Sequence, residues 1–317
     1  MNDTATVIAT SGLSKRYGRT WGLQDCTFNL PRGRIAALVG PNGSGKSTLL
    51  RMAAGITRPS AGEIRVLGSS PLEQPRDVLA RIGYLDQERP LYKTFRVSEM
   101  LRVGKELNRR WDDAKAHEYL EDLGIPLASR IGKLSVGQQA QVSLTLCLAK
   151  RPELLLLDEP VAALDPLARS QLMQVLLGSV TDEGTTVLLS SHALADLDVV
   201  CDYLIILSSS RVLLAGDLES LRAEHRLLVG PRRDRSNVPA GAELVSATDT
   251  ERQSTWLLRA IGSITAPGSD MVEPTLEEIV LAYLRQQPAG SHSRLAGSRD
   301  LSLADDPLDS GEQVRAR

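Results

Sequence analysis

The sequence of this 317-residue chain has no excess of charge of either sign. Its 37 lysine and arginine residues face 39 aspartate and glutamate residues, which gives a formal net charge of −2. Proteins that bind nucleic acid or an anionic membrane surface usually carry a strong basic excess, so the charge balance disfavours both classes. The hydrophobic content of 42% is that of an ordinary globular protein. We therefore expect about two domains of roughly 150 residues each, and no nucleic-acid partner.

Cysteine is scarce. The chain has three cysteines, which are far apart and form no CxxC pair or metal-ligand spacing: Cys26, Cys147 and Cys201. An odd number of scattered cysteines disfavours both a disulfide framework and a zinc site. The sequence predicts three free, mostly buried thiols in a reducing compartment.

Long apolar runs are missing as well. The strongest runs, such as the four leucines at 154–157, have the length of a β-strand, whereas a membrane-spanning helix needs about 18 or more apolar residues. The N-terminal residues lack the basic segment and apolar run of a signal peptide. We expect a cytoplasmic protein that acts at a membrane, if at all, through a partner.

Short runs rich in valine, isoleucine and leucine alternate with helical patterns along most of the chain. The predicted strands are 35–39, 81–85, 153–157, 185–190 and 203–207, and the predicted helices are 47–54, 97–107, 112–123, 137–150 and 167–180. Nearly continuous apolar strands that alternate with helices are typical of a parallel sheet covered on both faces. The predicted fold class is therefore α/β with a mostly parallel sheet.

Residues 88–150 contain several helical patterns and no convincing strand. In the predicted helix 97–107, one stripe holds Val97, Met100, Leu101, Gly104 and Leu107. Residues spaced three and four apart share one face of a helix, where apolar side chains pack on a neighbour. We interpret 88–150 as a helical subdomain inserted in the sheet.

The composition changes after about residue 228. A polar stretch is followed by a predicted strand at 255–260 and a predicted helix at 275–285, which indicate a small accessory domain over 229–286. Residues 287–317 are rich in serine, glycine, aspartate and arginine and hold few large apolar residues. Such a segment cannot bury enough apolar surface to order itself, so it is predicted to be a disordered tail.

A phosphate-binding motif occupies residues 40–48. The sequence GPNGSGKST fits the pattern G-x-x-x-x-G-K-[ST], follows the apolar run 35–39 and opens a helix. Gly43 and Gly45 let the backbone turn N–H groups toward phosphate, Lys46 reaches the β and γ phosphates, and Ser47 ligates Mg²⁺. The predicted nucleotide-binding residues are Gly40, Pro41, Asn42, Gly43, Ser44, Gly45, Lys46, Ser47 and Thr48.

Two adjacent carboxylates follow the run 154–157. Asp158 stands at the carboxyl end of this predicted strand, where an acidic group can hold Mg²⁺ through its water shell. Glu159 comes next and can orient an attacking water, because phosphoryl transfer depends on placement and on charge near the γ-phosphate. The alternative is a solvated acidic strand end. The phosphate motif upstream favours the site.

The segment LSVGQQAQ at 134–141 has two interpretations. Ser135 with Gln138 three residues later matches a capping box, in which the two side chains satisfy free N–H groups at a helix start. The N-terminus of a capped helix also binds anions, because its N–H groups and dipole favour negative charge. Asp165 followed by Pro166 is likewise typical of a helix start. A cap and a phosphate site are therefore compatible.

Together these motifs resemble those of the nucleotide-binding subunits of ABC transporters, over about residues 5–225. The resemblance implies a P-loop NTPase core with an antiparallel β portion at its N-terminus and an ATP-binding domain over 1–228. It also implies that Gln87 touches the metal and links to the permease, that His192 contacts the γ-phosphate, and that Tyr17 stacks on adenine. Alone, each of the three has a simpler interpretation as a loop amide, a strand-end cap or a surface ring.

The segment LSVGQ resembles the signature LSGGQ of this family. The resemblance implies that Ser135, Gly137 and Gln138 of one subunit close over the γ-phosphate bound by another subunit. In that other subunit, the phosphate is held by the phosphate-binding motif at residues 40–48, which we call the cradle. The resemblance also implies that Asp165 is the aspartate of the D-loop. The helix-cap interpretation remains compatible with this role, since the same N–H groups serve both.

Three residues depart from the family pattern. Val136 replaces a signature glycine, and its side chain either crowds the phosphate or packs on the helical subdomain. Gln141 stands where arginine is usual, and Ala162 stands where serine is frequent. The residues expected to act in catalysis are all present, namely Lys46, Gln87, Glu159 and His192, as are those expected to hold the metal, Ser47, Gln87 and Asp158.

The resemblance implies an ATPase subunit that binds ATP and Mg²⁺, dimerises around ATP and drives a separate transmembrane permease. Each motif occurs once, so two chains, in a homodimer or a heterodimer, are needed for two composite sites. The segment 273–285 also resembles the C-terminal part of subunits that serve bacterial type-2 export permeases, including drug exporters. This favours an exporter whose ATPase subunit lies on the cytoplasmic face of the membrane through the permease.

Two other classes of function are weaker. An ABC ATPase that acts on ribosomes or DNA remains the alternative, although such proteins usually carry two nucleotide domains or long coiled coils, and the sequence has neither. A GTPase is disfavoured because no N-K-x-D element for guanine recognition occurs. A permease that co-purifies with the chain would decide between transport and the alternative.

Overall fold

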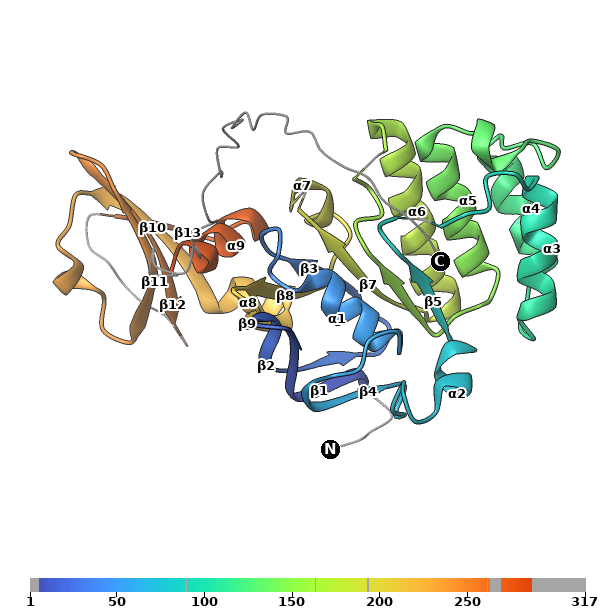
Figure 1. Ribbon diagram of the computed structural model, residues 1–317. Helices are drawn as coiled ribbons and strands as arrows, with labels where there is room; N and C mark the ends of the chain where they lie inside the picture. The colour runs from blue at the N-terminus through green and yellow to red at the C-terminus, as the bar shows by residue number, and fades with distance from the viewer. Residues whose placement is uncertain are drawn as a thin grey trace, which may run out of the picture. The chain divides into compact units, whose positions relative to one another are not determined.

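A six-stranded sheet forms the centre of the computed structural model, which describes residues 6–88, 90–162, 164–192, 194–260, 262 and 269–286 (Figure 1). In spatial order its strands are β5 (Ile82–Leu85), β6 (Leu154–Leu157), β7 (Thr186–Ser191), β3 (Ile35–Val39), β8 (Tyr203–Ser208) and β9 (Arg211–Asp217). All neighbouring strands are parallel except β9, which pairs antiparallel with β8. The predicted α/β class with a mostly parallel sheet is confirmed.

The parallel strands of this sheet are buried almost throughout because both of their faces are covered. In β6, Leu154 and Leu156 belong to one apolar core, while Leu155 and Leu157 belong to another on the opposite face. Successive side chains of a strand point to opposite faces, so a strand buried on both sides reads as a continuous apolar run. This explains why the sequence predicts these strands well.

An antiparallel sheet at the N-terminus covers one of the two cores. Its strands, in the order β2-β1-β4, are β1 (Thr6–Tyr17), β2 (Thr20–Pro31) and β4 (Ala61–Val66). The helix α1 (Lys46–Ala53) buries Leu49, Leu50 and Met52 in the same core as this sheet. The antiparallel portion that the family resemblance implies is therefore present, and it places the β1–β2 hairpin near the start of α1. The short helix α2 (Pro75–Leu79) follows β4.

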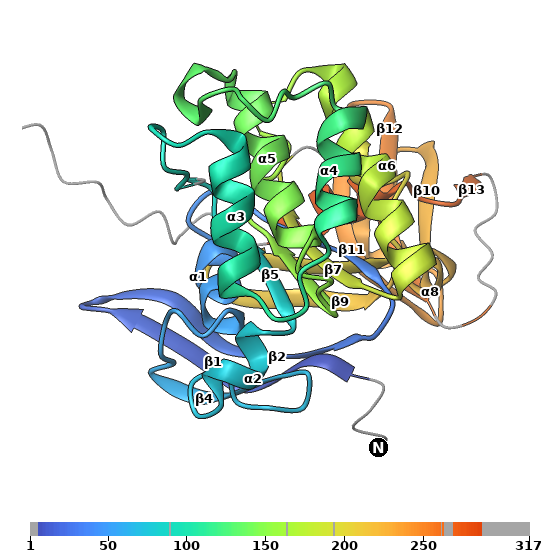
Figure 2. The ribbon, with the colours of Figure 1, turned by 90° about the vertical axis from the view of Figure 1, so that its right-hand side faces the viewer.

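Helices lie on the other side of the central sheet (Figure 2). They are α3 (Val97–Leu107), α4 (Asp113–Asp122), α5 (Val136–Leu148), α6 (Pro166–Glu183) and α7 (Leu194–Leu197), with a 3-10 turn at Ile131–Lys133 before α5. The first three share a separate apolar cluster, whereas α6 and α7 bury residues in the core that contains the sheet. The predicted stripe of α3 holds at Val97, Met100 and Leu101, which are buried, but is wrong at Leu107, which is 77% exposed in the last turn. Within the described part of the chain, no helix is long and apolar enough to cross a membrane.

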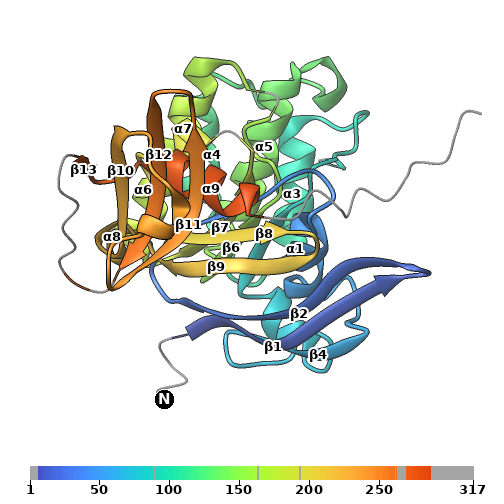
Figure 3. The ribbon, with the colours of Figure 1, turned by 90° about the vertical axis from the view of Figure 1, so that its left-hand side faces the viewer.

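The C-terminal residues form a second antiparallel sheet (Figure 3). After α8 (Leu218–Glu224) come β10 (His225–Pro231), a 3-10 turn at Arg235–Asn237, β11 (Ala242–Asp249), β12 (Gln253–Ala260), β13 (Asp270–Val272) and α9 (Leu276–Arg285), and the strands lie in the order β11-β12-β10-β13. Ile279 and Val280 of α9 share an apolar core with Leu204 and Ile206 of β8. The strand and helix predicted at 255–260 and 275–285 are thus found. The predicted tail, 287–317, lies outside the described residues.

The three cysteines are free and buried, as predicted. Burial raises the pKa of each thiol, and for Cys147 the pKa is about 11. A thiol with a raised pKa carries little of the reactive thiolate at neutral pH. The cysteines therefore act as small apolar core residues.

Candidate functional site

The phosphate-binding motif forms the turn between β3 and α1. At Gly45 the backbone φ is +109°, and a Cβ atom there would lie 2.3 Å from the carbonyl oxygen of Gly22. At Gly40 an added Cβ would lie 2.0 Å from the carbonyl oxygen of Leu207. Only glycine fits these two positions, because any side chain would collide with neighbouring backbone.

Lys46 begins α1 and is almost fully buried, at 7% exposure. Its Nζ donates hydrogen bonds to the carbonyl oxygens of Gly40 at 2.7 Å and Pro41 at 3.3 Å, and it lies 3.9 Å from Oε1 of Glu159. Burial lowers the pKa of Lys46, while Glu159 and Asp158 act in the opposite direction. The lysine head group therefore sits between the cradle and the acidic strand end.

Asp158 follows β6 and is 1% exposed. Its Oδ1 accepts a hydrogen bond from the Ser190 hydroxyl at 2.7 Å, but its Oδ2 is buried and has no hydrogen-bond partner among the described residues. The hydroxyl of Ser44, in the cradle, is also buried and also has no hydrogen-bond partner among the described residues. Buried polar atoms are nearly always paired, so two unpaired oxygens at this place indicate a site made for a ligand.

Glu159 and His192 form a hydrogen-bonded pair. Oε2 of Glu159 lies 2.8 Å from Nδ1 of His192, whose side chain is 63% exposed. The backbone of Glu159 has a φ of +49°, a left-handed conformation that is uncommon outside glycine and often occurs at functional sites. The Glu159 N–H donates to the Ser190 hydroxyl at 2.8 Å. Ser190 thus bridges the carboxylate of Asp158 and the backbone of Glu159.

A cavity of about 450 Å³ brings together half of the predicted site residues. It is lined by Tyr17, Thr20, Trp21, Gly22, Asn42, Gly43, Gly45, Lys46, Ser47, Thr48, Gln87 and Glu159. His192 does not line the cavity but contacts Glu159, which does. The described residues lining the cavity do not include Ser135, Gly137, Gln138 or Asp165.

Two aromatic rings stand at one end of this cavity, on the β1–β2 hairpin. Tyr17 is 50% exposed and Trp21 is 39% exposed. Nζ of Lys15 lies 5.1 Å from the Tyr17 ring centre, and the guanidinium of Arg16 lies 5.4 Å from that of Trp21. Trp21 was not predicted from the sequence. Trp21 pairs across the hairpin with Arg16, whereas Tyr17 pairs with Thr20, so the two rings point to opposite faces of the hairpin.

The start of α5 is built as the sequence predicts. Ser135 caps the helix, with its Oγ 3.1 Å from the Gln138 N–H and its own N–H 3.1 Å from Oε1 of Gln138. Asp165 caps α6, since its Oδ1 accepts the N–H of Ala168 at 2.9 Å. Val136 is 60% exposed. The interpretation that Val136 packs on the helical subdomain is therefore wrong, because most of its side chain faces outward.

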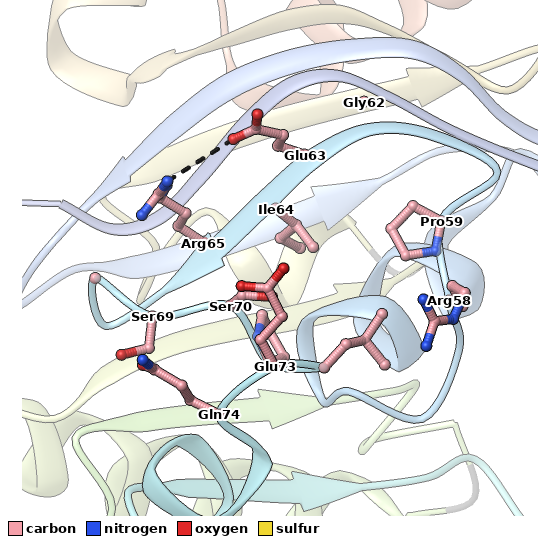
Figure 4. Close-up of a pocket in the computed structure, with 13 residues that line it drawn as sticks. Arg58, Pro59, Gly62, Glu63, Ile64, Arg65, Ser69, Ser70, Glu73 and Gln74 are labelled. Atoms are coloured by element: carbon pink, nitrogen blue, oxygen red, sulfur yellow. Dashed lines mark ion pairs between the residues drawn. The ribbon is translucent and has the colours of Figure 1, made fainter.

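A second cavity, of about 480 Å³, lies between β4 and the loop that follows it (Figure 4). The only ion pair among its labelled side chains joins Arg65 to Glu63 at 4.0 Å. Both side chains are more than half exposed, so this pair contributes little. None of the predicted site residues lines this cavity.

Comparison with known proteins agrees with this geometry. The sequence profile of the family described as "ABC transporter" matches residues 23–162. The Nod factor export ATP-binding protein I of Rhizobium johnstonii is 36% identical over 222 residues, covering 68% of this chain and 71% of that protein. The chain belongs to the ATP-binding proteins of ABC transporters, a family of ATPases.

Two further comparisons show how broad the likeness is. The aliphatic sulfonates import ATP-binding protein SsuB of Pseudomonas putida is 38% identical over 228 residues, covering 69% of this chain and 81% of that protein. A solved structure described as the ATP binding subunit of an ABC transporter is 29% identical, with a TM-score of 0.63, and the match covers 69% of this chain and 92% of that one. The P-loop NTPase fold of the ABC family is thereby confirmed, and the two relatives named transport in opposite directions.

Proposed function

We propose that this chain is the ATP-hydrolysing subunit of a transporter, and that two ATP-binding subunits close around two ATP molecules to drive a separate membrane permease. The proposal rests on one observation, namely that the predicted site residues lie at two separate places in the chain. The cradle, Tyr17, Gln87 and Glu159 line one cavity, whereas Ser135 and Gly137 lie at a capped helix start that does not line it. A second subunit, identical or different, would bring its own helix start over the nucleotide.

The nucleotide is proposed to lie along the cavity with its two ends held differently. The exposed aromatic ring of Tyr17 suits a flat base, which can stack on it. The cradle N–H groups, the N-terminus of α1 and Lys46 suit the phosphates, because all of them offer positive charge or donors. Ser135, Gly137 and Gln138 of the partner would meet the γ-phosphate from the other side.

The phosphate end also fits a hard divalent cation. Oδ2 of Asp158 is buried and has no hydrogen-bond partner in the described part of the chain, and the hydroxyl of Ser47 borders the same cavity. Mg²⁺ prefers oxygen ligands and takes only one or two from the protein, with phosphates and water as the others. We propose that Asp158, Ser47 and Gln87 hold it. When bound, Mg²⁺ would neutralise charge on the β and γ phosphates.

Hydrolysis is proposed to depend on Glu159. Its carboxylate lies at the cavity surface, is held at one oxygen by His192, and faces Lys46 with the other. A fixed carboxylate can orient a water toward the γ-phosphate and accept its proton as the new bond forms. Lys46 would then compensate the charge that develops on the β-phosphate oxygen of the departing ADP.

The permease contact is proposed to lie along 88–100. A cavity of about 490 Å³ beside Gln87 is lined by Leu91 and Met100 of this segment together with residues of α1, β5 and α5. Tyr92 follows Leu91 in the chain, is stacked on Phe95 with ring centres 5.1 Å apart, and is 63% exposed. An apolar cavity with an exposed aromatic beside it is typical of a protein interaction site.

Cross-linking tests this proposal. A photo-crosslinker at Tyr92 or Lys93 is expected to capture an integral membrane protein, while the same group at Val199, which is 84% exposed, serves as the control. Cross-links only to ribosomal or DNA-bound material would favour the alternative, a non-transport ABC ATPase. Capture of a permease from Val199 but not from Tyr92 or Lys93 would refute the assigned surface.

Export is the proposed direction of transport. Its support is the resemblance of 273–285, which forms α9 in the structure, to the corresponding part of subunits of type-2 export permeases. Purifying the captured permease with this chain and measuring ATP-driven movement in inside-out vesicles tests the direction. Uptake into inside-out vesicles corresponds to export, and release from them would refute it.

A further inference from the structure

Asp86 lies between β5 and Gln87 and binds three groups through one carboxylate. Its Oδ2 accepts hydrogen bonds from the Tyr84 hydroxyl at 2.7 Å and from Nε and Nη2 of Arg51 at 3.3 and 3.2 Å. Its Oδ1 accepts the N–H of Glu88 at 3.1 Å. The side chain of Asp86 is only 18% exposed. We name Arg51, Tyr84 and Asp86 the Asp86 clamp.

The clamp encloses the backbone of Gln87. Asp86 precedes Gln87 and Glu88 follows it, so the hydrogen bond from the Glu88 N–H to Oδ1 of Asp86 closes a turn around Gln87. The conformation of such a turn is rigid only if the carboxylate that accepts its hydrogen bond is itself held in place. Here the second carboxylate oxygen is held by two other side chains, which limits the orientations open to Gln87.

The clamp also joins the elements that carry the rest of the site. Arg51 lies in the last turn of α1, the helix that Lys46 begins. Tyr84 belongs to β5, which pairs with β6 up to Leu85 and Leu157, directly before Asp158. Gln87 is thereby placed relative to both the cradle and the metal-binding carboxylate.

We propose that the Asp86 clamp positions Gln87 for its contact with the bound Mg²⁺, so that Asp86 is a positioning residue of the ATPase. The proposal rests on the proposed function, in which Gln87 touches Mg²⁺. Because a misplacement of about 1 Å can cost up to ~10²-fold in rate, a loosened turn reduces turnover even though Asp86 itself touches no substrate.

The test compares Asp86→Ala with a matched control, Asp202→Ala. Asp202 also accepts one backbone N–H, from Ile35 at 2.9 Å, and one arginine, Arg34 at 3.1 Å, but it does not line the nucleotide cavity. Both variants are expected to unfold at a somewhat lower temperature. Only Asp86→Ala is expected to lower kcat, by about tenfold, with the KM for ATP changed by less than about threefold.

A second measurement does not depend on activity. The melting temperature is measured with ATP and EDTA and again with ATP and Mg²⁺, and the difference is the magnesium increment. Asp86→Ala and Gln87→Ala are each expected to lose at least half of this increment, and the double variant is expected to lose no more than Gln87→Ala alone. Tyr84→Phe removes one bond of the clamp and is expected to show a smaller loss, which keeps the test usable if Asp86→Ala does not fold.

The outcomes separate the two levels of the proposal. If Gln87→Ala leaves the magnesium increment unchanged, the proposed metal contact fails, and the clamp then has nothing to position. If Gln87→Ala loses the increment but Asp86→Ala and Tyr84→Phe keep it, the clamp is refuted while the proposed function stands. Additive losses in the double variant also refute it, because Asp86 would then act independently of Gln87.

Discussion

Lys46 is expected to make the largest electrostatic contribution among the side chains that bind the phosphates. It is buried against the cradle and lies 3.9 Å from Glu159, so its ammonium acts where solvent screening is weak. We expect Lys46→Ala to lower ATP turnover by ~10²–10³, the usual value of a preorganised electrostatic group. Steady-state ATPase assays and nucleotide binding check this. A loss below about tenfold would contradict the assigned role.

Glu159 is proposed to orient the attacking water and not to bind ATP. Substitution by glutamine separates the effect on hydrolysis from the effect on ATP binding. Glu159→Gln keeps the size of the side chain and a partner for His192 but removes the negative charge that accepts a proton. Hydrolysis is expected to fall by roughly 10²-fold or more, while the ATP-dependent dimer persists and lives longer. Light scattering with ATP measures the dimer, and a variant that stays monomeric would refute the assignment.

Val136 departs from the family signature at a place where the structure leaves its side chain 60% exposed. Little buried area is lost on removing it, so Val136→Gly is expected to change the free energy of unfolding by less than about 1 kcal/mol. If its Cβ crowds the partner's nucleotide, turnover or ATP-dependent dimerisation increases. ATPase rate and melting temperature, measured on the same variant, decide the matter. An equally slow and clearly less stable protein would contradict the crowding prediction.

Residues of the site differ in how far the sequence reveals them. Ser135 and Gln138 were predicted because a capping box is local, with both partners within three positions. Ser190 was not, because it bridges Asp158 and Glu159 from a neighbouring strand, 31 to 32 positions away in sequence. Ser190 lies beside these two residues only because β6 and β7 pair as parallel neighbours. The sequence around Asp158 and Glu159 does not reveal which strand pairs with β6.

At the scale of elements, prediction succeeded where burial was uniform. The strands buried on both faces gave continuous apolar runs, but β1, whose pairings shift register at several points, shows no regular alternation. β10 is half-buried on both faces and likewise gives no clear pattern. Bulges and partial burial remove the period on which strand prediction depends. The sequence does not predict β10, an inner strand of the C-terminal sheet, for this reason.

The contact between β10 and α9 includes a buried histidine that makes the C-terminal elements sensitive to acid. His225 is fully buried, with Nδ1 2.7 Å from the Leu221 carbonyl oxygen and Nε2 3.0 Å from the Tyr283 hydroxyl. Burial lowers its pKa, Arg259 lowers it further, and the Leu221 bond and Glu224 oppose them. The folded state therefore holds His225 neutral in a pH range in which the unfolded chain begins to bind a proton.

Because the unfolded state binds more protons, stability falls as the pH drops below the unfolded pKa of about 6.5. His225→Asn can keep the bond to Leu221 but cannot take up a proton. It is expected to be less stable than the wild type at pH 8, by about 1 kcal/mol for the lost Tyr283 bond, with a gap that narrows toward pH 5. Melting temperatures of both proteins across this range check the prediction. A gap that widens in acid would contradict it.

At the scale of the whole molecule, a site shared between two chains predicts how a mixture of two inactive variants behaves. If one chain's cradle works with the other chain's helix start, two variants that are inactive alone can complement each other. Lys46→Ala removes the cradle charge. Gly137→Asp places a carboxylate at the start of α5, where it suits the helix N-terminus but repels phosphate, and its Cβ meets nothing closer than a Leu164 side-chain atom at 3.4 Å.

In a mixed dimer of these variants, one composite site carries both defects and the other carries neither. Random pairing of two chains makes about half of the dimers mixed, so the mixture is expected to regain up to roughly a quarter of the wild-type activity. The measurement is ATPase rate against mixing ratio, with each variant alone as the control. The rate should be highest near equal amounts. A mixture as inactive as its components would mean that cradle and signature act within a single chain, and the proposed ATP-dependent dimer would then be wrong.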